Sequence, residues 1–385
     1  MRLSRRSGQD RTLNRLTTIL ARLRQDDRPW LDLTQSNPTQ AGIAYPADRI
    51  LAALADPAGL VYDPHPFGSA RARAAVAAEL SEDAPVDAER VVLTAGTSEA
   101  YGFLFKLLCD PGDEVLVPCP SYPLLETLAF LDGVRLVPYP LRWDGEWHLD
   151  LGALRRAVTP RTRAVMAISP NNPTGSYLGP EERDAVMSLG LPLVCDEVFL
   201  RFPVERLAAV SSALAATEGL VFVLGGLSKL AALPQMKLGW IAVSGTPSLV
   251  AESLARLEHV ADAFLSVSTP VQAALPTLLE TAAFARDQIR LRLLQNLGRA
   301  RSAVHSASPL SLLPVEGGWY AVMRLPQTRD EEAWATGLLE EEGVLVQPGY
   351  FYDFPDQAWL VVSLLTDPAV FAEGFERLVR HVDRA

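Results

Sequence analysis

Short apolar runs alternate with segments of helical character from about residue 90 onward. Such alternation is typical of parallel strands joined by crossover helices. The runs that we expect to be strands are residues 91–94, 114–117, 134–137, 163–168, 193–195, 220–224 and 238–243. The pattern therefore predicts an α/β fold whose large domain has a mostly parallel, seven-stranded sheet sandwiched by helices.

The chain changes character after roughly residue 265, where long helical stretches precede shorter strands at residues 319–324, 344–347 and 360–364 and a last helix near 368–382. This second pattern predicts a smaller α+β domain, and the cleft between the two domains is the expected ligand pocket. The predicted boundaries are an N-terminal arm at 1–45, a large domain at 46–270, and a linking helix with the small domain at 271–385.

The first segment of the chain is basic and amphipathic. Residues 1–28 carry eight arginines against three aspartates, and the leucines on one helical face are Leu13, Leu16, Leu20 and Leu23. We therefore expect an arm that packs with the small domain or with a partner subunit. The segment lacks the apolar core of a signal peptide, and no later run is long enough to span a bilayer, so we expect no membrane association.

Net charge and cysteine spacing argue against other classes of protein. A formal net charge of −11 does not provide the basic footprint of a nucleic-acid-binding protein, so we expect no nucleic acid partner. The three cysteines, Cys109, Cys119 and Cys195, follow neither metal-ligand nor disulfide spacing. We therefore expect a protein of the reducing cytoplasm without a metal site.

Polar residues follow the ends of several expected strands, where parallel sheets bind their ligands. The glycine, threonine and serine at residues 96–98 precede a helix and suit a phosphate, although an ordinary helix cap has the same composition. Asn172 lies among turn-forming residues, and Tyr122 lies in a loop beside a proline. Asp196 ends an apolar strand, where a carboxylate is costly to bury unless a cation lies beside it.

A lysine follows one of the most apolar strands. Lys229 comes shortly after the run 220–224 and a pair of glycines, with Ser228 beside it and Lys237 one loop away. An amine at the end of a buried strand, with a hydroxyl and a second cation nearby, suits an aldehyde that carries a phosphate. Taken alone, the stretch is more typical of a solvated surface charge, so its interpretation depends on the other segments.

Taken together and in this order, these segments resemble those of the fold type I, pyridoxal-phosphate-dependent aminotransferases of class I/II over nearly the whole chain. The segments that carry the resemblance are Tyr62 with Gly68, Gly96-Thr97-Ser98, Pro111-Gly112-Asp113-Glu114, Pro120-Ser121-Tyr122-Pro123, Asn172-Pro173-Thr174-Gly175, Asp196-Glu197, Ser228-Lys229, Lys237-Leu238-Gly239-Trp240 and Gly317-Gly318-Trp319-Tyr320. Each segment is weak by itself, whereas the ordered set is specific.

The resemblance implies a pyridoxal 5′-phosphate cofactor and a role for each matching residue. Lys229 would form the internal aldimine and move the proton, Asp196 would pair with the pyridine nitrogen, and Asn172 would donate to the phenolic oxygen. Tyr122 would stack on the ring. Tyr62 would reach the phosphate bound by the neighbouring subunit, which implies a homodimer with shared active sites. The residues that would hold the phosphate are Gly96, Thr97, Ser98, Ser228 and Lys237.

Four positions depart from the family pattern. Phe199, beside the cofactor, stands where the family has a tyrosine that donates to the phenolic oxygen, so one hydrogen bond is lost. Gly226 and Lys237 stand where the family has a serine and an arginine on the phosphate, so we expect looser anchoring. Val361 stands where the family has the arginine that binds the substrate carboxylate, an interaction of about 1.5–3 kcal/mol.

The missing arginine leaves three explanations open. Arg201 or Arg324 binds the carboxylate instead, the substrate is an amine or a modified amino acid, or the chemistry is not transamination. For each of the two arginines, an ordinary surface charge is the favoured interpretation.

The function implied by the resemblance is that of an aminotransferase (EC 2.6.1.-) of amino acid metabolism, which exchanges an amino group between an amino donor and an oxo acceptor. The alternatives are a lyase, decarboxylase or oxidative enzyme on the same scaffold, motivated by Phe199 and Val361, and a non-catalytic cofactor-binding module. We favour the module least, because the residues before Tyr62 resemble an enzyme's own N-terminal arm.

Overall fold

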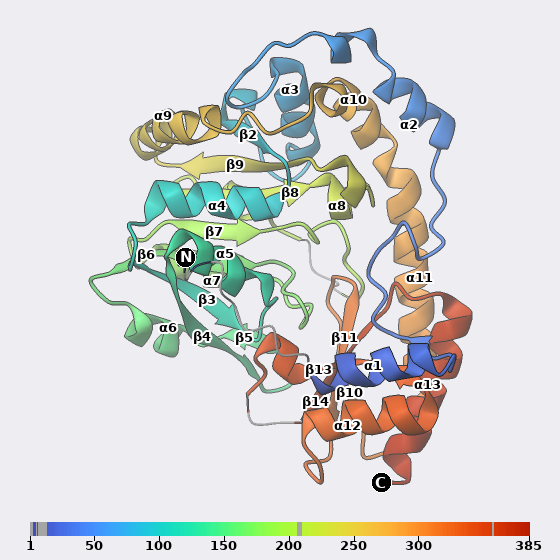
Figure 1. Ribbon diagram of the computed structural model, residues 1–385. Helices are drawn as coiled ribbons and strands as arrows, with labels where there is room; N and C mark the ends of the chain where they lie inside the picture. Colours follow the sequence, from blue (N-terminus) through green and yellow to red (C-terminus); the bar gives the residue numbers. More distant parts are fainter. Residues whose placement is uncertain (1–2, 5, 7–13, 206–209, 356–357) are drawn as a thin grey trace.

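Residues 3–4, 6, 14–205, 210–355 and 358–385 are described from a computed structural model (Figure 1). Leu13, one of the leucines of the predicted arm, lies outside these residues. Figure 1 shows two bodies joined by the long helix α11 (Ala282–Ala303). The body built on the large sheet is called the large domain below, and the body built on the smaller sheet is called the small domain. The predicted boundaries at residues 45 and 270 stay a prediction.

An eight-stranded sheet forms the centre of the large domain, in the order β2-β9-β8-β7-β6-β3-β4-β5. The strands from β8 to β4 pair in parallel, and the pairs at the two edges are antiparallel. All seven predicted strands are present, and β5 adds an eighth by pairing with β4 in a hairpin. The strands are β2 (Val91–Thr94), β3 (Glu114–Cys119), β4 (Arg135–Trp143), β5 (Trp147–Leu149), β6 (Thr162–Ile168), β7 (Leu193–Asp196), β8 (Leu220–Gly226) and β9 (Gly239–Gly245).

Helices cover both faces of this sheet, because successive residues of a buried strand point to opposite sides. Phe222 of β8 packs into one core with α4, α5 and α9, whereas Val221 and Val223 pack into a second core with α2, α3, α6, α7 and α10. The mostly parallel sheet sandwiched by helices is therefore confirmed. The helices are α2 (Ala47–Leu54), α3 (Ala70–Leu80), α4 (Thr97–Leu108), α5 (Leu124–Asp132), α6 (Leu151–Ala157), α7 (Pro180–Met187), α8 (Leu227–Leu230), α9 (Pro247–Asp262) and α10 (Thr269–Glu280). Short 3₁₀ helices are η2 (Pro57–Leu60), η3 (Ala88–Arg90), η4 (Ala213–Ala215) and η5 (Pro234–Met236).

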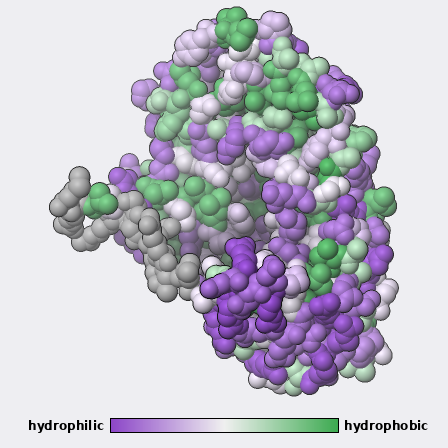
Figure 2. All heavy atoms as spheres, turned by 45° about the vertical axis from the view of Figure 1, so that its right-hand side comes forward, coloured by the Kyte–Doolittle hydropathy of each residue, from purple (hydrophilic) through white to green (hydrophobic). Residues whose placement is uncertain are grey.

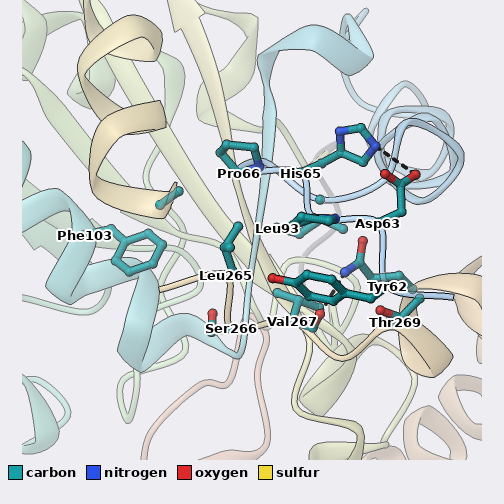
Figure 3. A pocket seen from close by; sticks show the side chains of 14 residues that line it. Tyr62, Asp63, His65, Pro66, Leu93, Phe103, Leu265, Ser266, Val267 and Thr269 are labelled. Atoms are coloured by element: carbon teal, nitrogen blue, oxygen red, sulfur yellow. Dashed lines mark hydrogen bonds and ion pairs between the residues drawn. The ribbon is translucent and has the colours of Figure 1, made fainter. Parts of the chain in front are cut away.

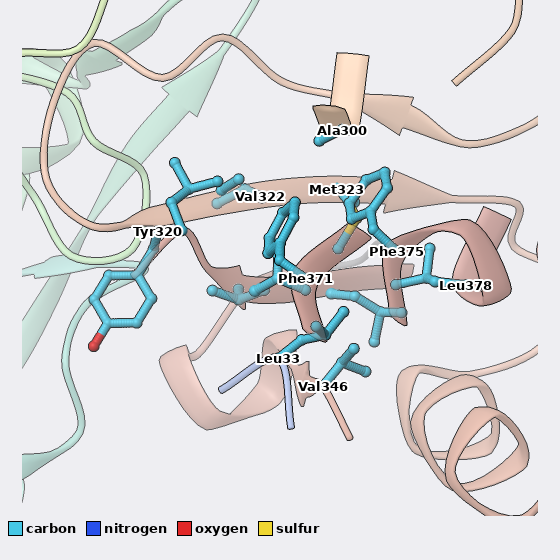
Figure 4. Packing of buried hydrophobic residues seen from close by; sticks show 14 of the residues in the cluster. Leu33, Ala300, Tyr320, Val322, Met323, Val346, Phe371, Phe375 and Leu378 are labelled. Atoms are coloured by element: carbon cyan, nitrogen blue, oxygen red, sulfur yellow. The ribbon is translucent and has the colours of Figure 1, made fainter. Parts of the chain in front are cut away.

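The small domain is built on a four-stranded antiparallel sheet in the order β10-β11-β14-β13. Figure 4 shows Phe371 and Phe375 of its last helix lying against Val322 and Met323 of β11 and against Leu33 from the N-terminal segment. The elements are β10 (Ser311–Leu312), β11 (Tyr320–Leu325), β13 (Gln347–Pro348), β14 (Ala358–Ser363), α12 (Glu331–Gly337), the π-helix η6 (Leu338–Glu342), the 3₁₀ helix η7 (Gly349–Tyr352) and α13 (Pro368–Asp383).

The N-terminal segment contributes to the small domain. The helix α1 (Arg15–Gln25) begins where the side chain of Asn14 accepts a hydrogen bond from the Thr17 backbone, a typical helix cap. Its buried residues Leu16, Ile19 and Leu23 belong to the small-domain core. Farther on, β1 (Leu31–Asp32) pairs in parallel with β12 (Val344–Leu345). Among the described residues, no helix is both long enough and apolar enough to cross a membrane.

Candidate active site

Lys229 lies at the end of β8, where two glycines allow another strand to approach closely. A side chain on Gly225 would meet the indole of Trp240 at 2.5 Å, and one on Gly226 would meet the Gly239 backbone at 3.1 Å. The Lys229 Nζ lies 4.9 Å from the ring centre of Trp319 and 5.4 Å from that of Phe199. Burial lowers the pKa of Lys229 to about 8, against the opposing effect of the Asp196 charge. Lys229 is therefore an amine that keeps a neutral fraction near neutral pH.

Asp196 ends the neighbouring strand β7 and is 8% exposed. Its Oδ2 accepts a hydrogen bond of 2.6 Å from the Tyr101 hydroxyl, and its Oδ1 accepts one of 3.0 Å from the Val198 amide. Burial raises the pKa of this carboxyl, whereas the two hydrogen bonds and the charge of Lys229 lower it. Because β7 and β8 are parallel neighbours, their carboxyl ends bring Asp196 and Lys229 to the same edge of the sheet.

Asn172 lies in a tight loop after β6. The loop is closed by two backbone hydrogen bonds, from Asn171 to the Ser176 carbonyl at 2.7 Å and from Gly175 to the Asn171 carbonyl at 2.8 Å. Asn172 is 7% exposed, yet its Oδ1 has no hydrogen-bond partner. Because buried polar atoms are almost always paired, this oxygen is free to accept a hydrogen bond from a ligand.

The predicted phosphate loop and a cation meet at the start of α4. Gly96 has a φ of 141° and begins the helix, with Thr97 and Ser98 in its first turn. A side chain built at Gly96 would lie 3.9 Å from the Lys237 Nζ, and one built at Gly239 would lie 3.0 Å from the Gly96 backbone. A helix N-terminus with an ammonium beside it suits an anion. Ser228 lies on α8, next to Lys229.

The loop that carries Tyr122 joins the two domains. Asn171 donates from Nδ2 to the Pro120 carbonyl at 3.2 Å, and the Ser121 amide donates to the Tyr352 carbonyl of the small domain at 2.9 Å. Tyr122 itself is 45% exposed. Hydrogen bonds from both domains therefore hold the backbone just before Tyr122, and the Tyr122 side chain is exposed.

Phe199 is buried among aromatic rings and lies near Lys229. Its ring centre is 5.2 Å from that of Trp319 and 6.3 Å from that of Tyr320, both in edge-on geometry. Trp319 is fully buried, and its Nε1 has no partner. The wall beside the lysine is thus apolar where a tyrosine would have supplied a hydroxyl.

Tyr62 is not brought together with the other predicted site residues in this single chain. It is 79% exposed and lines a surface cavity with Asp63, His65 and Leu265 (Figure 3). None of the other predicted site residues lines this cavity. Its predicted role requires a second subunit.

The two arginines considered as carboxylate ligands lie elsewhere. Arg201 forms ion pairs with Asp83 at 2.8 Å, Glu82 at 3.2 Å and Glu79 at 3.6 Å. Arg324 is exposed on β11 opposite Trp359. Arg201 is therefore engaged by acidic side chains of this chain. Val361 is completely buried in β14, where it pairs with Val322.

The sequence did not single out Tyr101, and it left Trp319 open between an aromatic-lined pocket and ordinary packing in the small domain. Tyr101 lies one turn beyond the phosphate loop on α4, and its spacing is that of an ordinary core residue. No group of three or more histidine, cysteine, aspartate or glutamate side chains able to hold a metal occurs among the described residues.

Comparison with known proteins places this chain in a family. The family model described as aminotransferase class I and II matches residues 28–378. Alanine aminotransferase of Mycobacterium tuberculosis is 28% identical over 372 residues, covering 93% of this chain and 86% of the relative. Alanine aminotransferase from Pyrococcus furiosus has the same fold, with a TM-score of 0.90 at 21% identity and complete coverage of both chains. A Thermus thermophilus aspartate aminotransferase single mutant has a TM-score of 0.84 at 27% identity, covering 99% of this chain and 100% of the other. The chain therefore belongs to the aminotransferase class I and II family and is a transferase of amino groups.

Proposed function

We propose that this aminotransferase uses pyridoxal 5′-phosphate to transfer an amino group from an amino acid to an oxo acid. The observation that carries the proposal is the buried Lys229 beside Asp196, at the edge of the sheet where the start of α4 and Lys237 form an anion site. A phosphorylated aldehyde with a basic ring nitrogen matches all three features.

The residues present fit this cofactor. Among the described residues the Asp196 carboxylate accepts two hydrogen bonds, so it retains acceptor capacity for a protonated ring nitrogen. Asn172 would donate from its Nδ2 to the phenolic oxygen, and its unpaired Oδ1 could accept a hydrogen bond from another group at the site. Gly96 leaves space in front of Lys237, where a phosphate would contact the ammonium and the helix amides. Tyr122 is the exposed aromatic ring proposed to cover the cofactor.

When bound, the cofactor supplies an electron sink that stabilises negative charge at the substrate Cα. With a pKa of about 8, Lys229 would be neutral in roughly a tenth of molecules at pH 7 and could attack a carbonyl carbon or hold a proton. Asp196, whose two donors favour its ionised form against the effect of burial, would hold positive charge on the ring nitrogen. The rings of Phe199 and Trp319 would exclude water from the Lys229 Nζ.

The proposed substrates are an amino acid donor and an oxo acid acceptor. The names of the relatives, alanine aminotransferase and aspartate aminotransferase, support small amino acids as the first to be tested. Which side chain binds the donor carboxylate is part of the same test, because Val361 is apolar and Arg201 is engaged in ion pairs.

We also propose a homodimer in which Tyr62 reaches the partner's phosphate site. Tyr62 follows two exposed apolar residues, Leu60 at 91% and Val61 at 62% exposure. Figure 2 shows hydrophobic side chains gathered on the upper part of the molecule, where α2 and α3 lie in Figure 1, and hydrophilic ones over the small domain. An exposed apolar segment of this kind suits burial against a second copy. We keep the reducing cytoplasm as the expected location, which the three free cysteines support.

The test uses protein loaded with pyridoxal 5′-phosphate and mixed with a panel of amino acids and amines, while the cofactor absorbance is followed. At least one donor should convert the cofactor to its amino form, and an oxo acid should reverse the change. Lys229→Ala is the control and should lower the rate by about ten-thousandfold. Carbon dioxide, ammonia or peroxide released without an acceptor, with no conversion, would contradict the proposal.

A further inference from the structure

Tyr101 is a buried tyrosine in direct contact with the carboxylate of the candidate site. It lies on α4 and is 6% exposed, and its hydroxyl donates to Asp196 Oδ2 at 2.6 Å. Its ring stacks on Phe105 of the same helix, with ring centres 6.5 Å apart and an angle of 25° between the planes. The hydroxyl is therefore held by a ring whose position is fixed by core packing.

In this hydrogen bond Tyr101 is the donor and the Asp196 carboxylate is the acceptor. Burial raises the pKa of Tyr101 well above its usual value, and the charge of Asp196 adds to this effect. Tyr101 therefore stays protonated and neutral, and it can donate to the carboxylate. A neutral donor stabilises the ionised form of Asp196 without neutralising its charge.

Tyr101 and the Val198 amide together fix the carboxylate of Asp196. One donor binds Oδ2 from α4, and the other binds Oδ1 from the loop after β7. A carboxylate held at both oxygens cannot rotate freely, so its remaining lone pairs keep one direction. Among the described residues, the other groups in electrostatic contact with Asp196 are Lys229 and the thiol of Cys195, which precedes it on β7.

The same helix carries the anion site. Gly96, Thr97 and Ser98 open α4, and Tyr101 follows within the next turn. Because an α-helix is rigid over this distance, the positions of the phosphate amides and of the Asp196 carboxylate are mechanically linked. The helix α4 would therefore fix the positions of both groups that bind a ligand, the amides at its start and the Asp196 carboxylate.

We propose that Tyr101 is a positioning residue that orients the Asp196 carboxylate and keeps it ionised for a cationic ring nitrogen. This inference rests on the proposed function. Tyr101 acts through its hydrogen bond to Asp196.

The test compares Tyr101→Phe with Tyr139→Phe. Tyr139 is a matched control, because it is 1% exposed and its hydroxyl donates to the Met166 carbonyl at 2.6 Å, away from Asp196. Both variants lose one buried hydroxyl, so both should lose a similar amount of thermal stability. The measurement is the Kd of pyridoxal 5′-phosphate for the apoprotein as a function of pH.

For Tyr101→Phe we expect the Kd to rise about tenfold at neutral pH. The acid limb of the binding profile should move upward by about one pH unit. Without the Tyr101 hydrogen bond, which lowers the pKa of Asp196, the effect of burial raises that pKa further. Tyr139→Phe should leave the limb in place. An unmoved acid limb in Tyr101→Phe, with wild-type binding intact, would overturn this inference alone. Absence of cofactor binding by the wild type would instead overturn the proposed function.

Discussion

Asp196 and Glu197 are consecutive buried acids, yet they serve two different regions of the molecule. Asp196 takes its hydrogen bonds from α4 and from the next loop, beside Lys229. Glu197 instead accepts hydrogen bonds from the loop before β8, one from the Ser212 hydroxyl and one from the Ala213 amide, each at 2.7 Å. Both carboxyls are less than a tenth exposed. Burial alone therefore does not identify the functional acid.

The two regions differ in what surrounds each carboxyl. A cation, Lys229, lowers the pKa of Asp196, whereas the nearby Asp83 helps to raise that of Glu197. Burial is the main cause in both cases, and it raises the pKa of Glu197 to about 7. Asp83 is itself engaged by Arg201 at 2.8 Å. Asp196 thus lies beside a cation, whereas Glu197 anchors the loop of Ser212 and Ala213, and no cation among the described residues lowers its pKa.

The largest expected difference between the two acids appears when each is replaced by its neutral amide. Asp196→Asn should lower amino transfer about a thousandfold, because a buried charge pair with the ring nitrogen is lost. Glu197→Gln should keep the rate within about threefold, since its carboxyl does not face the site. Steady-state kinetics of both variants against one donor checks this. Equal losses in the two variants would show that the regions are not distinct.

The second prediction uses pH and stability. The folded-state pKa of Glu197, about 7, lies above its ordinary 4.5, so between these values the folded protein holds a proton that the unfolded chain releases. The free energy of unfolding should therefore fall by on the order of 3 kcal/mol as the pH rises through this window. Glu197→Gln should remove that fall. Denaturant unfolding at several pH values measures it, and parallel curves for both proteins would contradict the assignment.

A third, smaller effect concerns Lys237 and the binding of the cofactor's phosphate. Lys237→Met should weaken binding of pyridoxal 5′-phosphate about tenfold, because the ammonium beside Gly96 is lost. Pyridoxal without its phosphate is the matched ligand and should bind the variant and wild type alike. Equal weakening of both ligands would place Lys237 in a general structural role.

The smallest expected effect concerns the apolar wall beside Lys229. Phe199→Tyr adds a hydroxyl where the structure has only aromatic carbon. We expect it to lower, by up to about one unit, the absorbance-detected pKa of the Lys229-linked cofactor, because the hydroxyl stabilises the deprotonated form. An absorbance titration measures this pKa, and an unchanged value would mean that the new hydroxyl does not reach the cofactor.

Much of the large domain could be predicted from sequence, because its strands are buried runs of β-branched and aliphatic residues. The prediction also indicated which loops meet, since parallel strands bring their carboxyl ends to one edge. The strand β5 was missed because Trp147, His148 and Leu149 form too short a run to stand out. The expected strand at 344–347 is divided between β12 and β13, which pair with different partners.

The contacts that refine the site depend on long-range packing. Tyr101 and Asp196 are 95 residues apart, and only the packing of α4 against the sheet brings them together. In the same way, the ion pair of Arg201 with Asp83 spans 118 residues. A tyrosine with helical spacing and an arginine after a strand have no feature in the sequence that reveals such partners.

The ties between the two domains have a mechanical consequence. At one point the described residues give five backbone hydrogen bonds to the small domain: Val204 to Glu316 at 2.8 Å, Gly318 to Phe202 at 2.9 Å, Gly317 to Gly175 at 3.1 Å, and Glu205 to Val315 and to Glu316, both at 3.2 Å. At the loop of Tyr122, the ties among the described residues are the Ser121 amide to the Tyr352 carbonyl at 2.9 Å and the Cys119 Sγ to the Asp353 carbonyl at 3.1 Å. A body fastened more firmly on one side swings from that side. We therefore expect any opening of the small domain to pivot near Trp319, beside Lys229. The Tyr122 loop should separate from the small domain first.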